Sequence, residues 1–156
     1  MTMGQPGETM PDAVLETPDG GSIGLSELRR PLVVYFYPKD DTPGCTREAQ
    51  DFSSLKAAFD MAGVSVIGIS RDPAKKKAKF IDKYDLKVPL ATDPGALSDA
   101  LGVWGEKSMY GRTYMGMERT TFLVAADGTI AQAWRKVKVP GHAEAVLAAA
   151  RALGDG

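Results

Sequence analysis

Cysteine is nearly absent from this sequence of 156 residues, which contains only Cys45. A single thiol excludes an internal disulfide, a zinc site built from several cysteines and a redox motif of two cysteines. Any chemistry at Cys45 therefore uses one sulfur atom per chain. A second sulfur, where the chemistry needs one, has to come from another molecule.

An excess of charge of either sign is also missing. The chain has 19 Lys and Arg against 20 Asp and Glu, which gives a formal net charge of -1 at pH 7. Proteins that bind nucleic acids typically carry a basic surface, and this balance does not provide one. No nucleic acid partner is predicted.

Long hydrophobic runs are absent as well. The longest extends from Pro31 to Tyr37 and falls far short of the roughly 20 residues that a membrane helix needs. The segment Met1–Met10 has neither a Lys or Arg nor an apolar block, so it does not have the pattern of a secretory signal. We therefore expect a cytoplasmic protein without membrane contact.

The composition is that of a soluble globular domain, with 44% hydrophobic and 25% charged residues. At this length the folded chain buries roughly two-thirds of its unfolded surface, so neither a disulfide nor a metal is needed for stability. Residues 1–11 combine Gly, Pro and polar residues without periodicity and are predicted to form a flexible tail. Residues 12–156 are predicted to form a single domain, because they contain no repeat and no linker.

The middle of the chain has an α/β pattern. Leu32–Pro38 is a continuous β-branched and aromatic run, typical of a strand covered on both faces, and we expect it at the centre of the sheet. From Thr46 the apolar residues recur every three or four positions, which predicts a helix that ends at Gly63. Val64–Ser70 is a second strand of the buried type. Strand, helix and strand in this order predict two parallel neighbours.

Shorter patterns complete the expected fold. Asp127-Gly128 is a strong hairpin signal between two apolar runs, and Pro18-Asp19-Gly20-Gly21 is a weaker one. The sequence also favours helices where apolar spacing follows a Pro or Gly start signal. The predicted elements are strands at Val14–Leu15, Ser22–Leu25, Thr120–Ala125 and Ile130–Trp134, and helices at Pro73–Tyr84, Leu97–Leu101 and Ala143–Leu153.

Cys45 follows the predicted central strand, at the start of the next helix. Thr42 suits the N-cap, Pro43 suits the first helical position, and Gly44 allows a ligand to approach the backbone. Unpaired amides and the helix dipole favour an anion there, and these are conditions that favour a thiolate. One helix terminus supplies only part of the required stabilisation, so we expect a cation nearby.

Arg119 is the candidate for that cation. It precedes the predicted strand Thr120–Ala125, and antiparallel pairing of this strand with Leu32–Pro38 would bring Arg119 toward Cys45. Glu48, one helical turn after Cys45, would oppose ionisation of the thiol. We expect Arg119 or Arg47 to offset its charge.

Two segments resemble a known family. YFYPKDDTPGCTREAQDF, Tyr35–Phe52, is similar to the active-site loop of the peroxiredoxins, with Pro38, Thr42 and Cys45 in the family's pattern. GVWGEKSMYGRTYMGMERTTFLV, Gly102–Val124, resembles the bacterioferritin comigratory protein or peroxiredoxin Q branch, with Arg119 at the family's arginine position. The resemblance extends over nearly the whole chain from Asp12.

The resemblance implies a thioredoxin-like fold, with a central mixed β-sheet flanked by helices, and a thiol peroxidase that acts on hydrogen peroxide and organic hydroperoxides. Cys45 would attack the peroxide as a thiolate and become a sulfenic acid. Thr42 and Arg119 would hold the peroxide oxygens, while Pro38 would shield the site from water. Pro38 and Gly44 are thus expected to line the substrate site. No metal, flavin or haem cofactor is expected.

The sequence departs from the branch at Gln50, where many members carry a resolving cysteine. An external thiol must therefore reduce the sulfenic acid, and thioredoxin, glutaredoxin with glutathione, or a small thiol are the candidate reductants. The resemblance also implies a monomer. A lone sulfenic acid is open to further oxidation to sulfinic acid.

Two other functions compete with the peroxidase. Disulfide exchange of the thioredoxin type requires a first active-site cysteine where this chain has Thr42, and one thiol cannot complete that cycle. A redox sensor or holdase would use oxidised Cys45 to change the binding of a partner. Such a protein would react once with peroxide and stop, whereas a peroxidase turns over.

Several polar and aromatic residues are expected to have no role in catalysis. His142 is predicted to be a solvated cap of the last helix, and Asp40 and Asp41 to be polar loop residues. A group of lysines is predicted to form the exposed face of a helix, with docking of an acidic reductant as the alternative: Lys75, Lys76, Lys77 and Lys79. Trp104, Tyr110 and Tyr114 fall in a glycine-punctuated loop that either covers the pocket or packs on the core.

Overall fold

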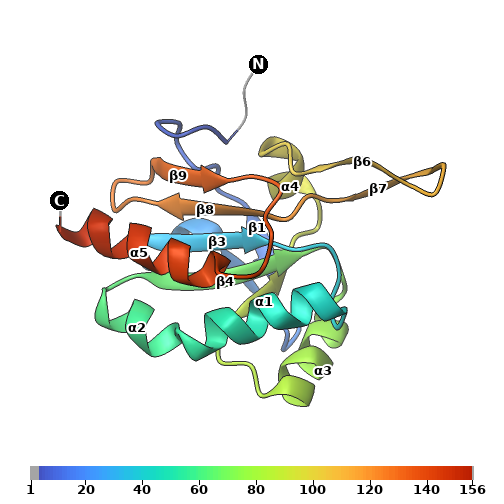
Figure 1. Ribbon diagram of the computed structural model, residues 1–156, viewed down its shortest axis with the longest axis horizontal. Helices are drawn as coiled ribbons and strands as arrows, with labels where there is room; N and C mark the ends of the chain where they lie inside the picture. Colours follow the sequence, from blue (N-terminus) through green and yellow to red (C-terminus); the bar gives the residue numbers. More distant parts are fainter. Residues whose placement is uncertain (1–3, 156) are drawn as a thin grey trace.

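The computed structural model describes residues 4–155, which form a seven-stranded mixed sheet flanked by helices and a separate two-stranded hairpin (Figure 1). The strand order in the large sheet is β2-β1-β5-β4-β3-β8-β9. This arrangement confirms the predicted α/β class. The strands are β1 (Val14–Glu16), β2 (Ser22–Gly24), β3 (Leu32–Phe36), β4 (Ser65–Ser70), β5 (Leu90–Thr92), β8 (Thr120–Val124) and β9 (Ile130–Trp134).

β3 lies inside the sheet, between β4 and β8. It pairs with β4 in parallel and with β8 antiparallel, with Phe36 opposite Thr120. All of its residues are buried, which explains its continuous apolar sequence. The register places the carboxyl end of β3 beside the beginning of β8, as predicted. The middle strand is β4 rather than β3, because β5, β1 and β2 extend the sheet beyond β4.

The helices follow the predicted positions with one interruption. The helix expected to reach Gly63 is divided at Leu55, whose φ of -98° and ψ of 2° leave the helical region. The Ser54 hydroxyl donates to the carbonyl of Asp51, a local hydrogen bond that competes with the helix. None of the helices within residues 4–155 combines the length and hydrophobicity needed to cross a membrane. The helical elements are η1 (Leu25–Glu27), α1 (Pro43–Ser54), α2 (Lys56–Met61), α3 (Ala74–Tyr84), α4 (Ala96–Ala100) and α5 (His142–Asp155).

Two hydrophobic cores cover the two faces of the sheet. Tyr35 belongs to the core formed with α1, α2, α3 and α5, and its ring stacks on Phe52 of α1 at 4.5 Å between centroids. Phe36 points to the opposite face, where it packs edge to face against Phe122 in the core that includes α4. The packing of α1 on the sheet holds its first turn near the carboxyl end of β3 (Figure 1).

The N-terminal segment is attached along the described part of the predicted tail. The amide of Gly7 donates to Ile130, the amide of Ile130 donates to Glu8, and the amide of Met10 donates to Gly128. Met10 is buried in the second core. The edge strand β9 and its preceding turn thus provide backbone partners that the tail prediction did not consider. Residues 1–3 of the predicted tail lie outside the described residues.

The segment with Trp104, Tyr110 and Tyr114, predicted to be a loop, is a β-hairpin. β6 (Trp104–Met109) and β7 (Arg112–Met117) pair antiparallel, and Tyr110 and Gly111 form the two-residue turn, both with positive φ. Such turns match the twist of a two-stranded ribbon. The prediction was wrong because Met117 is the only buried residue of the two strands, so no alternating apolar pattern marks them. The hairpin extends away from the large sheet (Figure 1).

Two charged residues predicted to be solvated are buried. Lys77 of α3 donates to the carboxylate of Asp40 at 3.2 Å, and both side chains have an exposed fraction of 0%. The Tyr37 hydroxyl donates to the other carboxylate oxygen of Asp40. The surface predictions for Lys77 and Asp40 were therefore wrong: their burial is compensated by a long-range pair that local spacing does not reveal. Asp41 remains near the surface, where it accepts from Lys83 and Tyr84.

His142 begins the last helix but is not a solvated cap. Its side chain is buried and its Nε2 lies 2.8 Å from the Thr121 hydroxyl, with the rings of Phe52 and Trp134 edge-on to the imidazole. Burial, together with the charge of Arg119, lowers the pKa of His142 to about 4. The imidazole is therefore neutral near pH 7. The prediction was wrong because β8 and α1 enclose the start of α5.

Candidate active site

Cys45 lies in the first turn of α1 and has an exposed fraction of only 2%. Pro43 begins the helix, so the missing amide of proline falls where helical amides have no partner. Thr42 occupies the N-cap position, as predicted, but its side chain makes no capping hydrogen bond. Its hydroxyl instead donates to the carbonyl of Lys39 at 2.9 Å, within the loop between β3 and α1.

Arg119 connects Cys45 to a buried carboxylate. It directly precedes β8, whose pairing with β3 carries it to the first turn of α1. Its Nη2 donates to Cys45 Sγ at 3.3 Å, and its Nη1 donates to Glu48 Oε1 at 2.7 Å. The structure thus brings together the cysteine and the cation that the sequence proposed for it. Arg47 pairs with Asp51 instead, so Arg119 is the residue that offsets Glu48.

Burial is the largest influence on the pKa of Glu48, the carboxylate that Arg119 contacts. It raises the pKa of Glu48 to about 7, although the charge and hydrogen bond of Arg119 oppose the shift. Glu48 Oε2 is buried without a hydrogen-bond partner. For Arg119, burial lowers the pKa, but the charges of Glu48 and Cys45 outweigh burial and the pKa is raised overall. Arg119 therefore stays cationic at physiological pH, while Glu48 titrates close to neutrality.

Gly44 provides space for the arginine. A Cβ atom at this position would lie 3.2 Å from Nη2 of Arg119. The sequence suggested that a ligand approaches Gly44, whereas in the structure the guanidinium occupies that side. Pro38 is half-buried and begins the loop that follows β3. Pro38 and Thr42 therefore lie on the same loop, upstream of the first turn of α1.

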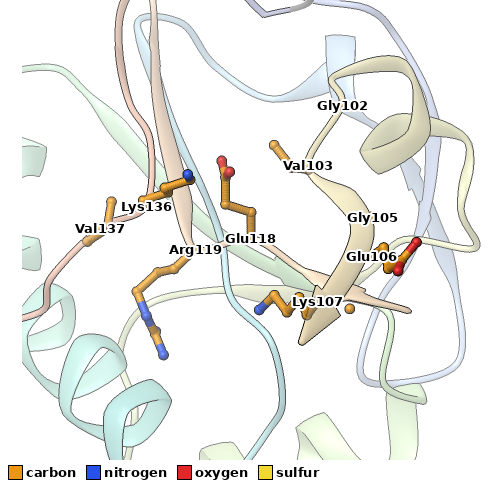
Figure 2. A pocket seen from close by; sticks show the side chains of 10 residues that line it. Gly102, Val103, Gly105, Glu106, Lys107, Glu118, Arg119, Lys136 and Val137 are labelled. Atoms are coloured by element: carbon orange, nitrogen blue, oxygen red, sulfur yellow. The ribbon is translucent and has the colours of Figure 1, made fainter. Parts of the chain in front are cut away.

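A pocket of about 400 Å³ opens beside Arg119, between the base of the β6–β7 hairpin and the segment that follows β9 (Figure 2). No sequence pattern marks its two lysines, Lys107 and Lys136, as site residues. Lysines on exposed segments are common, and only the tertiary arrangement shows that these two share a cavity with Arg119. The lining residues are Gly102, Val103, Gly105, Glu106, Lys107, Gly116, Glu118, Arg119, Lys136 and Val137.

Comparisons of sequence give one family. The model of the AhpC/TSA family matches residues 6–133, which include both Cys45 and Arg119. Peroxiredoxin Bcp of Xanthomonas campestris is 52% identical over 122 residues, covering 78% of this chain and 76% of the relative. Peroxiredoxin Bcp of Bacillus subtilis is 41% identical over 143 residues, covering 90% of this chain and 91% of the relative.

Comparisons of structure agree. The bacterioferritin comigratory protein of Xanthomonas campestris, solved in trapped intermediate and ligand complexes that concern its alkyl peroxide reduction activity, has a TM-score of 0.88 and 44% identity, covering 96% of this chain and 99% of that one. Peroxidoxin BcpB of Mycobacterium tuberculosis has a TM-score of 0.84 and 32% identity, covering 98% and 99%. The chain therefore belongs to the AhpC/TSA family, in the branch of the Bcp and peroxiredoxin Q proteins.

Proposed function

We propose that this family member is a thiol peroxidase that reduces hydrogen peroxide and organic hydroperoxides through Cys45. The observation that carries the proposal is the 3.3 Å contact between Arg119 Nη2 and the sulfur of the chain's only cysteine. The helix start and the guanidinium both favour a negative charge on that sulfur. A thiolate held in this way is the nucleophile that peroxide reduction requires.

In the oxidation step, the Cys45 thiolate attacks one oxygen of the hydroperoxide. A sulfur–oxygen bond forms, the oxygen–oxygen bond breaks, and the leaving oxygen takes a proton to depart as water or an alcohol. Arg119 is already aimed at the sulfur and stabilises the charge that moves onto the leaving oxygen. The Thr42 hydroxyl exchanges its hydrogen bond to the carbonyl of Lys39 for one to the peroxide and so helps to position the substrate. Gly44 acts on the substrate through the space it leaves for Arg119, and Pro38 limits the access of water.

In the reduction step, an external thiol attacks the sulfenic acid at Cys45 and releases water, forming a mixed disulfide. A second thiol then displaces Cys45 and restores the thiolate. Gln50, at the position of the branch's resolving cysteine, is exposed on α1 and offers no sulfur. Thioredoxin, or glutaredoxin with glutathione, supplies the thiol in this scheme, and the protein acts as a cytoplasmic monomer without a cofactor.

Replacement of the nucleophile tests the proposal. Cys45→Ser should abolish peroxide consumption in excess reductant, because no other cysteine is present. The wild type treated with one equivalent of peroxide should gain the mass of one oxygen atom, and a thiol should remove it. Turnover by Cys45→Ser would contradict the mechanism.

The same assay separates a peroxidase from a redox sensor or holdase. A sensor would consume one equivalent of peroxide per chain and stop, even with excess reductant. A peroxidase consumes many equivalents. Parallel reactions with thioredoxin and with glutathione plus glutaredoxin identify the reductant, because only the physiological system should sustain the rate.

A further inference from the structure

The pocket beside Arg119 adjoins the reacting site, because Arg119 belongs to both. Arg119, whose side chain is drawn in Figure 2, lines the pocket and also donates to Cys45 Sγ at 3.3 Å, whereas Cys45 is not among the lining residues. The volume of about 400 Å³ lies within the roughly 300–1,000 Å³ typical of small-molecule sites and excludes a protein partner from the interior. A small substrate that binds here by one end has to extend past Arg119 for its reacting atom to reach Cys45.

The pocket wall carries two lysines that pair directly with no carboxylate of the described residues. Within residues 4–155, Lys107 and Lys136 form no ion pair. Figure 2 shows the ammonium of Lys107 on the side of Arg119, and the carboxylate of Glu106 directed away from it. Glu118, toward which Lys136 points, accepts from Arg135 at 2.9 Å and from the Thr120 hydroxyl at 2.6 Å.

The charges of the reacting site contribute to the electrostatic environment of Lys107. Burial and then the charge of Arg119 lower its pKa, while the charges of Cys45 and Glu118 oppose the shift without cancelling it. A half-buried ammonium close to a second cation is stabilised when an anion binds between them. An anion bound in the pocket would therefore stabilise the charged form of Lys107.

We propose that this pocket binds the carboxylate of a small substrate, with Lys107 as its principal contact and Lys136 at the rim. The inference rests on the proposed function and adds the substrate class. Two sources share this chemistry: an acidic small thiol that reduces the sulfenic acid, and a hydroperoxide that carries a carboxylate. In the first case the thiolate sulfur attacks Cys45, a disulfide bond forms, and the sulfenic oxygen leaves as water.

The lining favours a carboxylate over a phosphate group. Glu106 and Glu118 also border the pocket, and their charges repel a dianion more strongly than a monoanion. Val137, which is half-buried in the lining, offers apolar surface for the carbon chain that joins the carboxylate to the reacting atom. Lysine ammonium groups act as point charges and do not require the bidentate geometry that arginine provides.

The thiol arm of the test uses three reductants of similar size and different charge: 3-mercaptopropionate, 2-mercaptoethanol and cysteamine. Their rates of reducing oxidised Cys45 are measured in the wild type, in Lys107→Gln and in Lys107→Arg. The ratio of the anionic to the neutral rate should fall about three- to tenfold in Lys107→Gln, and high salt should reduce it in the wild type. Lys107→Arg should restore the ratio.

The peroxide arm compares linoleic acid hydroperoxide with its methyl ester in the same variants, again as a ratio of rates. If Lys107→Gln changes the ratio of rates only for the thiols, the pocket binds the reductant. If Lys107→Gln changes the ratio only for the peroxides, the pocket binds the oxidant. Lys138→Gln is the matched control, because Lys138 is exposed, lies outside the lining and loses the same charge. Ratios that ignore Lys107 in both arms overturn the inference.

A binding measurement separates this inference from the proposed function. Hexanoate titrated into the protein should shift the NMR signals of the Gly105 and Gly116 amides, and Lys107→Gln should weaken the effect severalfold. This readout requires no turnover. Binding without peroxide consumption would reject the peroxidase and retain the site, whereas peroxide consumption without hexanoate binding would reject the site.

Discussion

Two buried ion pairs adjoin the loop between β3 and α1, and they differ in how completely their hydrogen bonds are satisfied. Lys77 donates to Asp40, to the Ser70 hydroxyl and to the carbonyl of Asp72, so its ammonium protons all have acceptors. Asp40 also accepts from Tyr37, and its amide donates to Asp72. This cluster is closed and joins the loop to α3.

The pair of Arg119 and Glu48 is open by comparison. One nitrogen of Arg119 is directed at a sulfur, the side chain retains an exposed fraction of 17%, and a pocket lies beside it. Glu48 leaves one buried oxygen without a partner. A buried pair with every hydrogen bond made fixes the backbone, whereas a pair that leaves donors and acceptors available can interact with a substrate.

Burial perturbs both pairs, with different consequences. It raises the pKa of Asp40 and lowers the pKa of Lys77, in each case against the attraction of the partner. In the open pair, burial brings the pKa of Glu48 to about 7, and Arg119 stays charged. In the closed pair desolvation outweighs the attraction, so each charge depends on its partner and the loss of one would leave the other buried alone. The open pair changes charge within the physiological range.

Removal of the cation from the closed pair should have the largest effect on stability. Lys77→Met leaves Asp40 buried without its counter-charge, and the loss of one partner of a buried pair costs about 3–5 kcal/mol. Urea unfolding followed by circular dichroism measures the change. Lys75→Met, at an exposed position of the same helix, should stay within about 0.5 kcal/mol of the wild type.

A second replacement checks the cause of that loss. The double variant Lys77→Met with Asp40→Asn removes the uncompensated charge and should recover part of the stability. A loss below about 1 kcal/mol in Lys77→Met, or no recovery in the double variant, would show that the closed pair does not hold the loop.

Removal of the cation from the open pair should act on chemistry. Arg119→Ala deletes the donor to Cys45 and should slow oxidation by hydrogen peroxide about 10²- to 10³-fold, the usual effect of losing one preorganised donor. Stopped-flow fluorescence with a single equivalent of peroxide measures the step, and circular dichroism should show a folded protein. Arg135→Ala, which breaks the exposed pair with Glu118, is the control and should oxidise normally. Oxidation of Arg119→Ala within a few-fold of the wild type would disprove the role.

Glu48 gives the open pair a pH dependence with a defined sign. Its folded pKa of about 7 exceeds the ordinary value of 4.5, so the folded state binds the extra proton. The stability that Glu48 contributes is complete below about pH 4.5 and is lost as the pH rises through 7. Glu48→Gln should therefore gain stability relative to the wild type between pH 5 and 8, by on the order of 3 kcal/mol at most. Urea midpoints across this range measure the difference, and a difference that stays constant or reverses sign would contradict the assignment.

Local patterns predicted the parts of the fold in which neighbours in sequence determine the structure. The uninterrupted apolar run of β3, the proline start of α1 and the Asp127-Gly128 turn were all confirmed. The approach of Arg119 to Cys45 followed from the antiparallel pairing of β8 with β3 and from the family resemblance. These features depend on periodicity, turn chemistry and one pairing rule.

The features that sequence missed depend on contacts between distant residues. Lys77 precedes Phe80 by three positions and so shares its buried helical face, but the acceptors that permit a buried ammonium come from a loop far along the chain. The partner of His142 is on β8, and the lysines of the pocket come from β6 and from the segment after β9. No local pattern contains such pairings.

The smallest expected effect comes from displacing the Arg119 guanidinium without removing it, which tests whether its position affects the oxidation rate independently of stability. Gly44→Ala places a Cβ atom 3.2 Å from Arg119 Nη2, so the guanidinium must move by a few tenths of an ångström. Oxidation should slow about three- to tenfold, since misplacement of a catalytic group lowers the rate without breaking a bond. Stability should stay unchanged or rise by up to about 1 kcal/mol, because alanine favours the helix. Gln50→Ala, exposed on the same helix, is the control and should leave oxidation unchanged. A Gly44→Ala protein that oxidises at the wild-type rate would show that Arg119 tolerates displacement, and the contact with Cys45 would then not limit the reaction.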